Sequence, residues 1–146
     1  MRLERYPLEA NDDLMSFQFV SEGPKGQIIK WVQFLKTDKP NFYNLAFGDK
    51  RLNEDDFDDD VITDNKDSQK VLATVAMAVL RFTEINKEAL IIAQGLTKSR
   101  NRLYQMGISQ NLEELKEYFK IIGFYKGNWM IYEKNTPYDA FAVKRK

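Results

Sequence analysis

The segment that most constrains this fold lies near the middle of the chain, where residues 68–85 are apolar around much of a helix. A helix on a protein surface carries an apolar stripe on one side only. Here most positions hold alanine or a larger apolar residue, and the larger ones are Val71, Leu72, Val75, Met77, Val79, Leu80 and Phe82. We therefore expect a helix that Asp67 or Ser68 caps, that runs to about Ile85 and that is buried against a sheet.

The residues before this helix predict the sheet. Residues 14–20 alternate between apolar and polar, as in a half-buried strand. A turn rich in glycine and proline follows at 21–26, and the β-branched and aromatic residues at 27–36 predict the second strand of a hairpin. Residues 41–47 predict a third strand. The chain therefore opens with an antiparallel meander.

The second half of the chain predicts another strand, two helices and a strand pair. Residues 89–93 are typical of a buried strand. The later elements are expected as helices at 99–106 and 109–119, a hairpin or bent strand at 124–133, and a strand at 138–144. We expect Gly107 to separate these two helices and Gly123 to end the second of them. The order β-β-β-α-β-α-α-β-β predicts a single α+β domain over residues 1–146, with three helices on a mixed, mainly antiparallel sheet.

The absence of cysteine and histidine narrows the chemistry. Without cysteine there is no disulfide or thiolate metal site, and without histidine the usual general base near neutral pH is missing. An enzyme built from this chain must use carboxylates, tyrosine, lysine, serine or threonine. The polar start at 1–6 predicts no signal peptide, and the longest apolar stretch, 71–80, is too short to cross a bilayer. We therefore expect a cytoplasmic protein that does not contact a membrane.

Charge is unevenly distributed along the chain. Residues 49–67 hold nine acidic and three basic residues, which predicts a solvated acidic loop whose like charges keep it mobile. Its carboxylates could bind a divalent cation, but the run lacks the glycine and the distal glutamate of a calcium loop, and we expect no metal. Residues 95–146 hold ten lysines and arginines against five acidic residues, a balance that suits an anionic partner.

A candidate site follows the buried strand. The segment from Gly95 to Tyr104 joins a glycine turn to the start of a helix, where free backbone amides and the positive helix end favour an anion. Its candidate ligand-binding residues are Thr97, Lys98, Ser99, Arg100, Arg102 and Tyr104. Arginine can hold a phosphate or a carboxylate through two parallel hydrogen bonds. Arg100 and Tyr104 lie four residues apart on one helix face, whereas Arg102 points elsewhere.

The same residues also fit a structural role. Thr97 or Ser99 would then cap the helix, and the two arginines would pair with acidic side chains of the same chain. Replacing Arg100 and Arg102 by Gln separates the two interpretations, because a binding residue on the surface contributes little to stability.

The order of elements resembles the core of the acetyltransferases of the Gcn5-related type. In that family a meander leads into a cofactor-binding helix, and a strand, a helix and a terminal strand pair follow. The segment 99–104, followed by residues 122–124, is similar to one of their helices. Their acyl coenzyme binds on a glycine-rich loop before the long helix, but residues 64–70 contain no glycine. The resemblance therefore implies the fold alone, and we expect no cofactor.

A second resemblance covers nearly the whole chain. Residues 97–108 resemble the segment Thr-Lys-Ser-Arg-x-Arg-Leu-Tyr-x-Met-Gly-Ile of a family of uncharacterised small bacterial proteins. Residues 138–146 are similar to the ending of the same family. This resemblance implies no established function.

Three functions remain open at this point. The first is a small binding or interaction module with an anion-binding turn at 95–104, whose partner is an unidentified protein or a small anionic ligand. The second is a divergent acyl- or other group transferase that uses Tyr104 or Tyr132 as general acid. The third is nucleic-acid binding through Lys98, Arg100, Arg102 and the tail at 144–146. We expect a binding module rather than an enzyme, because no catalytic constellation stands out.

Overall fold

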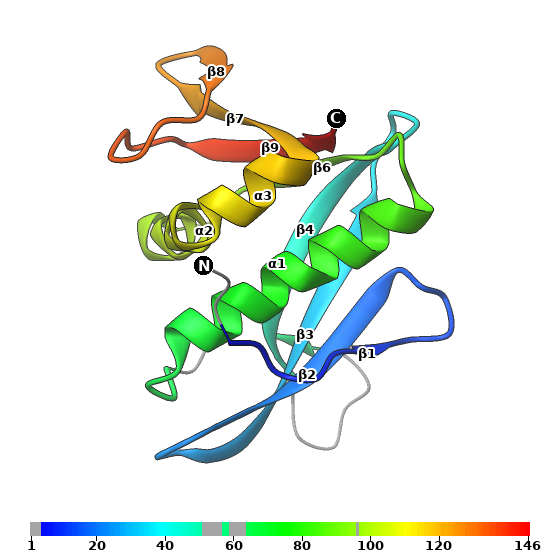
Figure 1. Cartoon of the computed structure of the whole chain (residues 1–146), viewed down its shortest axis with the longest axis vertical. Helices are drawn as coiled ribbons and strands as arrows, with labels where there is room; N and C mark the ends of the chain where they lie inside the picture. Colours follow the sequence, from blue (N-terminus) through cyan, green and yellow to red (C-terminus); the bar gives the residue numbers. More distant parts are fainter. Residues whose placement is uncertain (1–3, 51–56, 59–63, 96) are drawn as a thin grey trace.

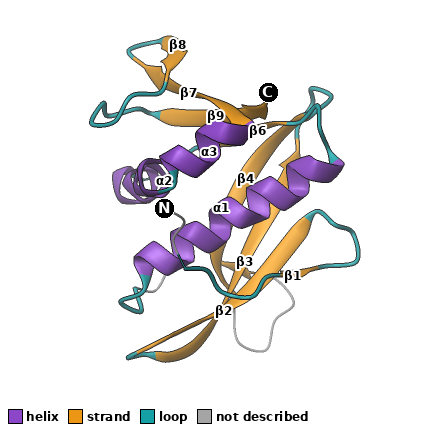
Figure 2. Ribbon diagram, in the orientation of Figure 1, coloured by secondary structure: helices purple, strands orange, loops and turns teal. Residues whose placement is uncertain are grey.

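The computed structural model describes residues 4–50, 57–58, 64–95 and 97–146. It is an α+β fold in which helices lie over one face of an open sheet (Figures 1 and 2). The strands follow the path β1-β2-β3-β4-β6-β9-β7-β8, and β5 pairs with β4 off this path. No helix among the described residues is long and apolar enough to cross a membrane.

The first strands form the predicted meander. They are β1 (Glu9–Ala10), β2 (Ser16–Gly23), β3 (Gly26–Lys36) and β4 (Phe42–Lys50), and all three neighbouring pairs are antiparallel. The short β1 was not predicted, because two residues carry no periodic signal.

The predicted acidic loop begins later than its charges indicate. Strand β4 extends to Lys50, so Asp49 belongs to the sheet rather than to a loop at 49–67. Strand β5 (Phe57–Asp58) pairs with the end of β4. Residues 51–56 and 59–63, which include most of the acidic run, lie outside the described residues. The mobility of the acidic loop therefore stays a prediction.

Helix α1 (Ser68–Ile85) connects the meander to β6 (Leu90–Ala93). Strand β6 lies parallel to β4 and antiparallel to β9 (Ala140–Arg145), which makes the sheet mixed. The helix buries Val71, Phe82 and most of the apolar residues between them. The ring of Phe82 stacks on Phe34 of β3 with centroids 4.1 Å apart. The prediction of a helix packed on the sheet is confirmed.

Helix α2 (Lys98–Gln110) is longer than predicted, because Gly107 does not interrupt it. A Cβ at Gly107 would lie 3.2 Å from Leu72 Cδ2 of α1. The glycine therefore lets the two helices approach closely. The helix ends at Asn111, whose backbone and side-chain N–H groups both donate to the Gly107 carbonyl.

The prediction that Gly123 ends a helix is also wrong. Helix α3 (Leu112–Tyr118) is short, and β7 (Phe119–Tyr125) begins at once, with Gly123 inside the strand. A Cβ there would lie 2.3 Å from the ring of Tyr138. Strand β8 (Asn128–Ile131) pairs antiparallel with β7, so of the two alternatives predicted for residues 124–133 the hairpin is confirmed. Gly107 and Gly123 are therefore positions where another side chain packs closely against the backbone. From the sequence alone both glycines were predicted to interrupt or end a helix.

Candidate functional site

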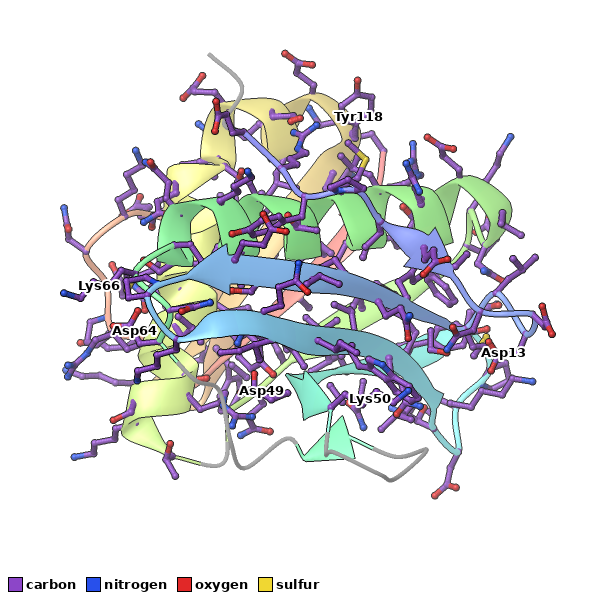
Figure 3. The ribbon with its side chains drawn as sticks, turned by 90° about the horizontal axis from the view of Figure 1, so that it is seen from below. Asp13, Asp49, Lys50, Asp64, Lys66 and Tyr118 are labelled. Atoms are coloured by element: carbon purple, nitrogen blue, oxygen red, sulfur yellow. The ribbon has the colours of Figure 1, made fainter. Side chains whose placement is uncertain are left out.

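A cleft opens where α1 and α2 begin. Its volume is about 410 Å³. Its wall is formed by Asp64, Asp67, Ser68, Val71 and Leu72 from the α1 side, by Thr97, Ser99, Arg100, Leu103 and Met106 from the α2 side, and by Lys30 of β3. We call it the interhelix cleft. Asp64, labelled in Figure 3, lies near the tip of the β2–β3 hairpin. The neighbouring Asn65 accepts a hydrogen bond from the Lys25 N–H at that tip.

The start of α2 has a side-chain cap. Thr97 Oγ1 accepts a hydrogen bond from the Arg100 N–H (3.1 Å), and the Thr97 carbonyl accepts one from Asn101 (3.0 Å). The N–H groups of Lys98 and Ser99 have no intrahelical acceptor, because they belong to the first turn. Of this first turn, Thr97, Ser99 and Arg100 line the cleft.

The turn before α2 is held by one asparagine. Asn101 accepts a hydrogen bond from the Gly95 N–H (3.0 Å) and donates one to the Tyr138 carbonyl (2.6 Å). A Cβ on Gly95 would lie 2.4 Å from the Asn101 N atom, so only glycine fits this approach. The Gly95 amide is therefore used inside the turn, and it is not one of the free amides that the sequence predicts.

Arg100 extends from α2 into the cleft. Its Nη1 donates to the Phe47 carbonyl at 3.3 Å, a hydrogen bond that holds the side chain over the sheet. Within the described residues the guanidinium makes no ion pair with a carboxylate. A guanidinium has five N–H donors, so donors remain for a ligand.

Lys30 contributes a buried positive charge to the wall. Its Nζ lies 2.6 Å from Asp49 Oδ1, and its side chain is only 1% exposed. The sheet places it there, because Lys30 alternates with Val32 and Phe34 on the face that α1 covers. The sequence analysis overlooked this residue. The signal was a lysine at an inward position of an otherwise apolar strand.

The start of α1 differs from the start of α2. Asp67 occupies the N-cap position, but its side chain does not cap the helix. Its Oδ2 instead accepts hydrogen bonds from the Tyr6 hydroxyl (2.5 Å) and from Ser21 Oγ (2.6 Å). Burial, and then the hydrogen bond to the Asp67 carboxylate, raises the pKa of Tyr6. The first amides of α1 are thus left without a side-chain cap at the cleft.

Three of the six predicted site residues line the cleft, namely Thr97, Ser99 and Arg100. Lys98 is exposed outside its wall. Arg102 lies on another side of α2, as predicted, where it borders a shallow depression with Asn135 and Pro137. Tyr104 is buried on the side of α2 that packs on α1, one turn beyond Arg100. Asp67 and Ser68 also belong to the wall of the cleft. The sequence analysis considered them only as alternative caps of the first helix.

The tyrosines proposed as general acids lie away from this cleft. The Tyr132 hydroxyl is 2.6 Å from Ser109 Oγ, and burial raises the pKa of Tyr132. A raised pKa makes a phenol a weaker acid. Neither Tyr104 nor Tyr132 contributes to the wall of the cleft.

The basic tail is divided between two faces of the sheet. Arg145 donates to Thr83 Oγ1 (2.9 Å) and to the Leu80 carbonyl (2.8 Å), so it is engaged with the end of α1. Lys144, its neighbour, points to the opposite face, and its Nζ lies 3.5 Å from Glu88. The cations that the nucleic-acid hypothesis groups together are therefore not on one face.

The comparison with family models covers almost the whole chain. Residues 2–146 match a family described as a family of unknown function, DUF6934. The chain belongs to this family. No curated protein and no solved structure gives a significant match, so the resemblance of the DUF6934 chain to acetyltransferases stays a prediction. Over the part of the chain that the structure describes, no group of three or more carboxylates is arranged to hold a metal ion.

Proposed function

We propose that this protein binds a small anion, a carboxylate or a phosphate, in the interhelix cleft. The observation that carries the proposal is the convergence of two helix starts and Arg100 on one cavity of about 410 Å³. Ligand pockets typically have about this volume and a few convergent polar groups. Helix starts favour anions because their first amides and the helix dipole point at the ligand.

The α2 side is the part of the wall that suits an anion, because both carboxylates of the wall, Asp64 and Asp67, lie on the α1 side. Lys30 is paired with Asp49, and the Asp67 carboxylate is occupied by two hydroxyl groups. Arg100 keeps donors that the Phe47 carbonyl does not use. The anion would therefore lie between Arg100 and the start of α2, where Ser99 supplies a hydroxyl.

Titration calorimetry with inorganic phosphate and with acetate tests this proposal. Arg100→Gln should weaken binding at least about tenfold, because a hydrogen bond to a charged group contributes about 1.5–3 kcal/mol. Arg102→Gln is the matched control, since Arg102 is exposed on the same helix but outside the cleft. It should bind both anions as the unchanged protein does.

Two results would contradict the proposal. One is that neither phosphate nor acetate binds at millimolar concentration. The other is that Arg100→Gln and Arg102→Gln weaken binding equally, which would indicate attraction by net charge rather than a site. Circular dichroism on both variants checks that a loss of binding does not come from unfolding.

A further inference from the structure

The sheet has a second face, which the described helices leave uncovered (Figure 2). Side chains alternate between the two faces along each strand, and residues paired across neighbouring strands lie on the same face. Lys30 of β3 lies on the face that α1 covers, so Ile29 on the same strand lies on the opposite face, together with its β2 partner Val20. We call this uncovered side the outer face.

The outer face is apolar where a polar surface is expected. An antiparallel sheet that packs on one side usually carries polar residues on its solvent side. The described residues include nine large apolar side chains that are exposed, and five of them belong to strands of the outer face. These five are Val20 of β2, Ile29 and Leu35 of β3, and Trp129 and Ile131 of β8. Apolar residues gathered on one surface mark an interaction site.

A hollow of about 630 Å³ lies in this face between two projecting parts. The loop at 37–39 after β3 borders it at one end, and Trp129 of β8 borders it at the other. The strands between these borders supply an apolar floor, which is formed by Leu90, Ile92, Ile122 and Ala142. The hollow therefore suits an apolar side chain of a partner.

Ile131 lies directly beside this hollow. It pairs with Ile122 of the floor, and it follows Trp129 by two residues on the same side of β8. Its side chain is 80% exposed, more than any other large apolar side chain among the described residues. The outer face thus has a projecting apolar side chain next to an apolar hollow.

We propose that two copies of this chain pair through their outer faces, with Ile131 of each copy in the hollow of the other. A two-fold axis produces such an interface, because both copies then use the same patch and each contact occurs twice. Ile131 and the hollow are neighbours on one face, so a single interface holds both contacts. The two sheets would pack face to face, as in a β-sandwich.

The outer face has the size that a stable dimer needs. Seven strands, from β2 to β8, lie side by side in the sheet, which makes it about 29 Å wide. Strands β3, β4 and β7 contain 11, 9 and 7 residues, so they are between about 23 and 36 Å long. In a standard interface each partner buries about 800 Å², the area of a square with sides of about 28 Å.

The charges beside the contact fit a second copy rather than a strongly charged partner. The loop that borders the hollow carries Asp38 next to Lys39, and the exposed residues beyond Ile131 are Glu133 and Lys134. Each of these two pairs is neutral as a whole. The loop of one copy therefore does not repel the residues beyond Ile131 of the other, and each charge has an opposite charge available to it.

Sedimentation velocity over a concentration series tests the pairing. The unchanged chain should sediment as a dimer at high micromolar concentration and dissociate on dilution. Ile131→Asp should raise the dissociation constant at least about a hundredfold, because the symmetric dimer buries this residue twice. A chain that stays monomeric over the whole series would overturn the inference.

Ile85→Asp is the matched control. Ile85 is also well exposed, but it lies at the end of α1, on the helix side of the sheet. This variant should form the dimer as the unchanged chain does. A dimer that Ile131→Asp leaves intact, or that both variants weaken equally, would contradict pairing through the outer face. Circular dichroism checks that both variants are folded.

Introduced cysteines locate the contact, because the chain contains no cysteine of its own. Ile131→Cys mixed with Asp38→Cys should give a mixed disulfide-linked dimer when an oxidant is added. Ile85→Cys mixed with Asp38→Cys should not. Equal yields of the two mixed products would contradict the proposed contact. Arg100 and the interhelix cleft lie on the helix side, so anion binding and dimer formation are tested independently.

Discussion

The two sides of the interhelix cleft are built differently. On the α2 side Thr97 caps its own helix, and Arg100 has only a backbone carbonyl as partner among the described residues. On the α1 side Asp67 accepts hydrogen bonds from Tyr6 and Ser21, and on the sheet Lys30 of β3 pairs with Asp49 of β4. Residues that line the same cleft therefore have different roles. Asp67 and the Lys30–Asp49 pair stabilise the fold, whereas Arg100 on the α2 side is the group that we propose for the ligand.

The largest effect is expected from Asp49→Asn, which removes the partner carboxylate of Lys30 in the sheet. Removing this charge takes from the buried Lys30 ammonium the carboxylate at 2.6 Å. Breaking a buried ion pair costs about 3–5 kcal/mol of unfolding free energy, because the ammonium stays buried without this counter-charge. Urea denaturation measures the change. A loss below about 1 kcal/mol, the range of surface pairs, would mean that the fold does not depend on this pair.

Asp67→Ala should have the next largest effect. It removes the acceptor of the Tyr6 and Ser21 hydroxyls, and we expect a loss of about 2 kcal/mol, because hydrogen bonds to a charged group contribute about 1.5–3 kcal/mol. Phosphate affinity should not fall, since the variant removes a negative charge from the wall. A stable variant that no longer binds phosphate would reverse the roles of the two sides.

Thr97→Ala should have a smaller effect on stability. Loss of an N-cap typically costs about 1 kcal/mol, and here the cap has a single hydrogen bond to the Arg100 N–H. Thr97→Ser is the control, because serine keeps the hydroxyl. We expect the alanine variant to weaken anion binding as well, since α2 begins less regularly. Equal effects of Thr97→Ala and Asp67→Ala on both stability and binding would remove the contrast.

The smallest effect is expected in the pH dependence of stability, through the ionisation of Tyr6. Tyr6 has a raised pKa in the folded protein, so at high pH the folded state holds its proton more tightly than the unfolded state. Its contribution is complete below the ordinary tyrosine pKa of about 10 and is lost as pH rises through the folded value. Tyr6→Phe should therefore flatten the fall of stability above pH ~10. The slope of stability against pH is also measured for Tyr132→Phe, because the pKa of Tyr132 is raised in the folded protein as well. An unchanged slope in Tyr6→Phe would contradict this assignment.

Much of the fold follows from local patterns, and the exceptions have a common cause. The meander, the buried helix and the strand at Leu90 show clear periodicity, and the structure confirms them. Gly107 and Gly123 were interpreted as breaks because glycine favours turns. In the fold each one makes room for a side chain from a distant segment, Leu72 and Tyr138 respectively. A single sequence does not show such contacts.

The candidate site was predicted in part for the same reason. Thr97, Ser99 and Arg100 are close in sequence, so a local motif was enough to find them. Lys30 and Asp67 reach the same cleft from other elements, and their roles depend on partners that are distant in sequence. Asp67 or Ser68 was expected to cap the helix, but the Asp67 carboxylate instead accepts hydrogen bonds from Tyr6 and Ser21, which are distant in sequence.

The position of β9 has a consequence for how the chain folds. This strand comes after all the others in sequence, yet it lies inside the sheet, between β6 and β7. Until it docks, β6 and β7 each have an unpaired edge, and such edges readily pair with another molecule. We predict that pulse-labelling hydrogen exchange would show the β6 amides that face β9 gaining protection together with the amides of β9, while the Leu90 amide, which donates to Asn41, can be protected earlier. Earlier protection of the β6 amides that face β9 would contradict this. The interval before β9 docks is then when self-association competes most strongly with folding.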